Sequence, residues 1–113
     1  MIRRIPSKIP TRSRSVIHAG IVSTVAVAER KVPSLYEQTR DALAIIERNL
    51  AEAGSHKSKI LTAMIYITDV MQKPEMNRAW DEWVDRSNIP MRACVGAGLE
   101  GDDLIEIIVT AAV

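Results

Sequence analysis

Short stretches rich in β-branched residues recur along the chain and predict β-strands. In the later stretches apolar and polar residues also alternate, which places successive side chains on opposite faces of a sheet. Gly20 falls between two stretches, where a tight turn suits it, and residues 100–103 have the composition of a turn. Strands are expected at 2–5, 15–18, 21–28, 60–70, 91–98 and 104–112.

The clearest helical signal lies in the first half of the chain. Ser34 and Glu37 have the capping-box spacing, in which the serine side chain accepts from the amide three residues on. Gly54 stands where a left-handed C-cap belongs. A helix over residues 35–53 is therefore predicted, and its apolar positions recur at helical spacing as Leu43, Ile46 and Leu50.

A second helix is expected to begin near Pro74, because proline is well tolerated in the first turn. Met76, Trp80 and Trp83 then form an apolar stripe at helical spacing. The helix should stop by Pro90, because the residue before a proline is pushed out of the helical region.

This order of elements predicts an α+β fold in one domain, residues 1–113, with both helices on one face of a single sheet. The last predicted strand is apolar on both sides: Ile105, Ile107 and Val109 alternate with Ile108 and Thr110. A face left uncovered by helices would be too apolar for a monomer. We therefore expect self-association that buries the second face.

Composition narrows the class of protein. No apolar run is long enough to cross a bilayer, and no secretory h-region follows the basic N-terminus. The single cysteine, Cys94, excludes an internal disulfide, so a reducing cytoplasm is the expected location. A basic arm precedes the first acidic residue and could bind nucleic acid, although a solvated strand and loop is the favoured interpretation. Its basic residues are Arg3, Arg4, Lys8, Arg12 and Arg14.

Candidate chemistry concentrates in the last two predicted strands. Alternation places Arg92 and Cys94 on one face of an apolar strand, where a guanidinium is costly to desolvate unless it meets an anion. Glu106 is a second charged residue in an apolar run. We expect the two strands to pair across a short turn and to bring Arg92 and Glu106 to one region, as a ligand site or as a plain ion pair. His18 and His56 are far apart, and no metal-ligand spacing is present.

Several segments in the same order resemble a known family. They are 50–54 at the end of the first helix, 60–69 with its Thr68-Asp69 end, 76–80, Pro90-Met91-Arg92 with Cys94-Val95, and 104–107. Together they resemble the RidA (YjgF) proteins, once described as L-PSP ribonucleases. The short length and the segment 54–60 are similar to the compact YoaB-like branch.

The resemblance implies a chorismate-mutase-like fold that assembles as a homotrimer, with a central strand barrel and ligand clefts between subunits. It also implies an enzyme, a hydrolytic deaminase that converts 2-aminoacrylate or 2-iminobutanoate to 2-keto acids and ammonia without a cofactor or metal. Its partner would be a small carboxylate-bearing substrate. Membrane binding is not expected, and nucleic acid is the least favoured partner.

The family motif assigns roles to four positions. Arg92 would bind the substrate carboxylate, and Glu106 would position the attacking water. Cys94 would line the pocket, with inert packing as the favoured role, and Asn77 would lie near the cleft. An ordinary surface position on the helix is nearly as good an interpretation of Asn77.

The sequence also departs from the family pattern. The family tyrosine is absent from 12–15, and Ala26 stands where the prototype has glycine. Arg12 or Arg14 could instead add a second positive group. These departures keep open a non-catalytic trimer that binds a carboxylate metabolite, with ribonuclease activity as the third alternative.

Overall fold

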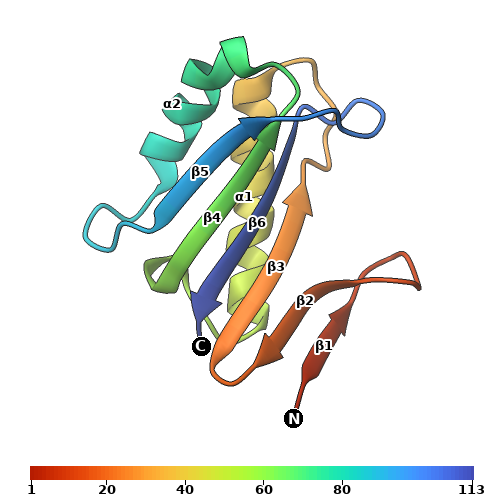
Figure 1. The fold of residues 1–113 in the computed structure, drawn as a ribbon, viewed down its shortest axis with the longest axis vertical. Helices are drawn as coiled ribbons and strands as arrows, with labels where there is room; N and C mark the ends of the chain where they lie inside the picture. Colours follow the sequence, from red (N-terminus) through yellow and green to blue (C-terminus); the bar gives the residue numbers. More distant parts are fainter.

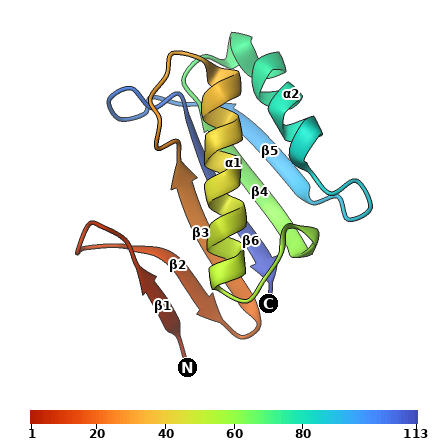
Figure 2. The ribbon, with the colours of Figure 1, turned by 180° about the vertical axis from the view of Figure 1, so that it is seen from behind.

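The computed structural model describes all 113 residues. The chain folds into one six-stranded sheet with two helices packed on one of its faces. Figure 1 shows the uncovered face of the sheet, and Figure 2 shows α1 and α2 lying across the other face. Neither helix has the combined length and apolar character that crossing a membrane requires. The elements are β1 (Arg3–Pro6), β2 (Ser13–His18), β3 (Ile21–Val27), α1 (Leu35–Glu52), η1 (Lys57–Lys59), β4 (Ile60–Ile67), η2 (Val70–Gln72), α2 (Lys73–Trp83), β5 (Met91–Gly96) and β6 (Ile105–Ala112).

The strand order is β1-β2-β3-β6-β4-β5, and every neighbouring pair is antiparallel except β4 with β5. The expected pairing of the last two strands is wrong, because β4 lies between β5 and β6. Two parallel strands need a crossover, and α2 provides it between β4 and β5. β6, which is apolar on both sides, takes the central place that such a strand favours.

The core lies between the sheet and the helices. Alternate residues of the four strands β3 to β6 face the helices, and the buried cluster includes Leu43, Ile46, Ile65 and Ile107. A register shift between Ile60 and Thr62 makes Leu61 an extra residue. Leu61 is therefore exposed, and Ile60 occupies the buried position.

The predicted caps of α1 are confirmed. The Ser34 hydroxyl accepts from the Glu37 amide at 3.2 Å. At the other end Gly54 adopts a φ of 82°, and the Ser55 amide donates to the Leu50 carbonyl at 2.8 Å. This is the Schellman pattern, which satisfies carbonyls that have no partner inside the helix.

The second helix ends earlier than Pro90, at Trp83, because Val84 is already extended. The Lys57 amine donates to the Trp83 carbonyl at 2.9 Å and so satisfies one of the last carbonyls of α2. The Trp83 indole nitrogen donates to Glu47 of α1 at 2.8 Å, which fixes the two helices against each other.

A buried polar network joins β2 and β3 to α1. The Thr24 hydroxyl accepts from the Ser15 hydroxyl at 2.8 Å and from the Asn49 amide at 3.0 Å, and it donates to the Arg14 carbonyl at 2.9 Å. Thr24 is only 2% exposed. The network therefore pins the N-terminal hairpin to the helix without leaving its buried groups unpaired.

No helix covers the second face of the sheet (Figure 1). Apolar side chains of the four adjacent strands β3, β6, β4 and β5 lie on it, and Ile108 and Val95 remain 38% and 39% exposed. The expected uncovered apolar face is confirmed, and self-association through it stays a prediction. The main apolar residues of this open face are Val25, Val27, Met64, Met91, Val95 and Ile108.

Candidate functional site

Arg92 lies on β5, the edge strand, and its side chain is directed under α2. One guanidinium nitrogen lies 3.8 Å from the Met76 sulfur, and the guanidinium carbon lies 5.3 Å from the centre of the Trp80 indole ring. A cation over an aromatic face is stabilised by the quadrupole of the ring. These contacts hold the guanidinium half-buried at the edge of the sheet.

No carboxylate pairs with Arg92 within the chain. Arg14, the other half-buried arginine, instead forms two hydrogen bonds to Glu52, one of them at 3.0 Å between Nε and Oε1. Because a desolvated guanidinium needs an anionic partner, Arg92 has an unused capacity to bind a carboxylate. The alternative of an ion pair with Glu106 does not hold inside one chain.

Cys94 lies two residues beyond Arg92 on the same face of β5. Burial raises the pKa of its thiol above the usual value, while the nearby cations Lys73 and Arg92 lower the pKa by less. The thiol is therefore neutral near pH 7 by this balance of effects. A neutral thiol fits the favoured role of inert packing, and the place of Cys94 in the lining of a ligand site stays a prediction.

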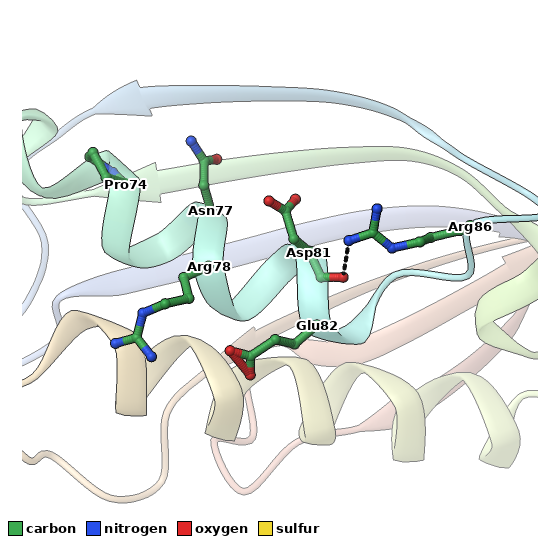
Figure 3. Close-up of a pocket in the computed structure, with 6 residues that line it drawn as sticks. All are labelled: Pro74, Asn77, Arg78, Asp81, Glu82 and Arg86. Atoms are coloured by element: carbon green, nitrogen blue, oxygen red, sulfur yellow. Dashed lines mark hydrogen bonds between the residues drawn. The ribbon is translucent and has the colours of Figure 1, made fainter.

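Asn77 projects from α2 on the side away from α1, whereas Arg78 and Glu82 point toward α1 (Figure 3). Its Oδ1 atom is buried and has no hydrogen-bond partner. Asn77 also lines an open polar depression of about 490 Å³ along α2. A buried amide oxygen without a donor is costly, so Asn77 is suited to accept from a ligand.

Glu106 lies on the opposite face of the sheet from Arg92. Its neighbours across the two adjacent strands are Tyr66 on β4 and Val27 on β3. Its side chain is half-buried on the open face and makes no hydrogen bond within the chain. The expectation that Arg92 and Glu106 reach one region is therefore wrong for a single chain, because neither their strands nor their faces adjoin.

Two residues of interest were missed at the sequence level. Tyr66 lies directly opposite Glu106, and its half-buried hydroxyl makes no hydrogen bond within the chain. Lys73 is the first residue of α2 and lies close enough to Cys94 to act on its pKa. Only the strand register reveals that Tyr66 and Glu106 are neighbours.

The residues that depart from the family pattern have structural roles here. Ala26 is buried with its side chain toward the helices, so its Cβ contributes to the core. Arg14 is bound to Glu52 and to the Pro6 carbonyl and is not available as a second ligand cation. The remaining basic residues of the arm, Arg3, Arg4, Lys8 and Arg12, are exposed.

The histidines do not form a site. His56 accepts from the Ser58 amide at 3.0 Å and so caps η1. His18 is exposed at the end of β2. No three side chains of the types that bind metals gather anywhere in the structure.

Comparison with known sequences supports one family. The family model described as Endoribonuclease L-PSP matches residues 9–113. A RutC family protein of Haemophilus influenzae is 37% identical over 106 residues, which cover 93% of this chain and 88% of the relative. The RutC family protein YoaB of Escherichia coli is 39% identical over 99 residues, or 87% of each chain.

Solved structures agree with the sequence relatives. A YjgF family member from Neisseria meningitidis superposes with a TM-score of 0.93 at 39% identity and covers 99% of this chain and 94% of its own. A protein from Pseudomonas aeruginosa superposes with a TM-score of 0.92 at 29% identity and covers 99% and 98%. By both sequence and fold, this chain belongs to the RidA (YjgF) family.

Proposed function

We propose that the chain is a hydrolase that deaminates reactive 2-imino acids, of the 2-aminoacrylate and 2-iminobutanoate type, to 2-keto acids and ammonia. The observation that carries this proposal is the half-buried Arg92 guanidinium, which has no carboxylate partner in its own chain. The motifs around Arg92 resemble those of the RidA (YjgF) family, and this resemblance supports the same reaction. A carboxylate is the group that this guanidinium would grip through two parallel hydrogen bonds.

The proposed site requires more than one copy of the chain. Arg92 faces the helices and Glu106 faces the open side, so one sheet cannot direct both at the same substrate. The uncovered apolar face gives a physical reason for copies to pack together. We infer a homotrimer in which Glu106 of one copy approaches Arg92 of its neighbour, with the cleft between them.

In the proposed reaction the substrate contains an iminium carbon that is bonded to a carboxylate. Arg92 fixes the carboxylate and so presents the iminium carbon to a water molecule. Glu106 takes a proton from that water as the new C–O bond forms, and it later returns the proton to the nitrogen as the C–N bond breaks. The hydroxyl proton passes to Glu106 as the C=O bond forms and then to the departing ammonia, so one iminium ion and one water give one 2-keto acid and one ammonium ion.

The test compares the rate of 2-keto acid formation with and without the protein while a dehydratase generates 2-aminoacrylate in the same solution. We expect the wild type to accelerate this step, and Arg92→Met to lose about tenfold to a hundredfold, since a charge-assisted hydrogen bond contributes about 1.5–3 kcal/mol. The matched control is Arg48→Met, which removes an exposed cation from α1.

An absence of acceleration by the wild type would refute the enzyme proposal for these substrates. Binding of a 2-keto acid that depends on Arg92, with no rate effect, would instead favour a carboxylate-binding trimer. Light scattering after gel filtration tests the assembly separately. A monomer would refute the intersubunit cleft, because Arg92 and Glu106 would then stay on opposite faces.

A further inference from the structure

Lys73 is a half-buried cation without a partner. Lys57, the other half-buried lysine, donates to the Trp83 carbonyl, and the exposed Lys31 pairs with Asp103. The Lys73 amine makes neither a hydrogen bond nor an ion pair within the chain. Like Arg92, Lys73 is therefore a cation on a half-buried side chain with no anionic partner within the chain.

The two unpaired cations lie in the same region. Lys73 begins α2, and Met76, one turn further along, contacts the Arg92 guanidinium. The positive charges of Lys73 and Arg92 both act on the Cys94 thiol between them, where each lowers its pKa against the larger effect of burial. Lys73 thus lies near the part of α2 and β5 that holds Arg92.

Asn77 completes this arrangement. It follows Lys73 by four residues, so the two side chains lie one above the other on the same side of α2. Its buried Oδ1 lacks a donor. Two cations without a carboxylate partner in the chain and one unpaired acceptor therefore belong to the part of α2 that packs on β5.

This set of groups fits a ligand with two negative charges better than one with a single charge. Like charges that are partly desolvated repel each other, and the substrate carboxylate that Arg92 grips, with Glu106 of the neighbouring copy occupied by the water, leaves Lys73 without an anion of its own. A second carboxylate on the ligand would pair with the remaining cation. The acceptor oxygen of Asn77 complements an N–H donor on the same ligand.

We propose that Lys73 determines specificity in the Arg92 site and selects 2-imino acids that carry a second carboxylate on their side chain. Arg92 binds the carboxylate next to the reacting carbon, and Lys73 binds the side-chain carboxylate. Asn77 accepts a hydrogen bond from the iminium nitrogen. This proposal rests on the proposed function, since it assigns the substrate class of the same site.

Calorimetric titration with stable 2-keto acids tests the preference without relying on catalysis. The probes are 2-ketoglutarate, which has two carboxylates, and 2-ketobutanoate, which has one. We expect the wild type to bind 2-ketoglutarate about tenfold more tightly, because one further charge-assisted contact forms. Lys73→Met should abolish the preference by weakening the binding of 2-ketoglutarate about tenfold more than that of 2-ketobutanoate, and Lys73→Arg should restore it.

The control Arg48→Met removes the same charge from the outer side of α1 and should keep the preference. Equal affinity of the wild type for both probes, or a preference that survives Lys73→Met, would overturn the proposal. Kinetics with 2-iminoglutarate and 2-iminobutanoate, generated by an amino acid oxidase, separate the two hypotheses. If the wild type accelerates the hydrolysis of both substrates at equal kcat/KM, only the proposed role of Lys73 is refuted. If it accelerates the hydrolysis of neither substrate, the deaminase activity is refuted, and the titration then judges the binding preference.

Discussion

Replacing Thr24 by valine tests how strongly the buried polar network anchors the N-terminal hairpin. Valine has nearly the same shape as threonine, so packing is preserved while the hydroxyl is lost. The Ser15 hydroxyl, in a residue 1% exposed, then loses its acceptor, and the Asn49 amide keeps only its 3.4 Å contact with the Val25 carbonyl. The Arg14 carbonyl loses a donor.

The expected cost follows from these orphaned groups. A buried donor left without a partner costs about 1–3 kcal/mol, so the Ser15 hydroxyl and the weakened Asn49 contact together predict a loss of about 3 kcal/mol. That is a large share of the roughly 5–15 kcal/mol by which a domain is stable. Thr24→Ser keeps the hydroxyl and removes one methyl group, which costs only about 1 kcal/mol.

Urea unfolding, followed by circular dichroism at equal protein concentration, measures these differences, because association also stabilises the folded state. We expect Thr24→Val to lower the free energy of unfolding in urea by about 3 kcal/mol, which corresponds to a Tm about 10 °C lower in thermal unfolding of a chain of this size. Thr11→Val, at an exposed loop position, is the matched control. If Thr24→Val is as stable as Thr11→Val, the network does not anchor the hairpin.

Two further predictions concern the hairpin turn and the site thiol. Ala19 has a φ of 51°, which is costly for a residue with a Cβ, so Ala19→Asn before Gly20 should stabilise the fold by about 0.5–1 kcal/mol in urea unfolding. A loss of stability would contradict this. The pKa of Cys94 is raised in the folded chain, so its thiolate fraction at neutral pH is lower than in the unfolded chain. When labelling by iodoacetamide is measured against pH, the midpoint for the folded protein should therefore lie above that for the urea-unfolded protein. Lys73→Met removes a nearby cation and should move the midpoint higher still, and a downward shift would refute the proximity of Lys73.

The local elements were predictable because their signals lie within a few residues of one another. Ser34 and Glu37 marked the start of α1, and Gly54 marked its end, since caps depend on backbone groups one turn away. The excess of apolar residues in the last strand also predicted an uncovered face. Arg92 and Glu106 could be singled out as charges in apolar strands, a property of composition alone.

Tertiary structure decided which of these residues are neighbours. Strand order depends on contacts between distant segments, and the sequence does not show that β4 separates β5 from β6. That order places Glu106 beside Tyr66 and on the opposite face from Arg92. The sequence does not distinguish Lys73, which precedes Pro74, from an ordinary solvated lysine. Its position near Arg92 follows only from the packing of α2 over β5. The sequence by itself therefore determined the elements and the candidate charges, while the packing of helix on sheet determined which charges share a groove.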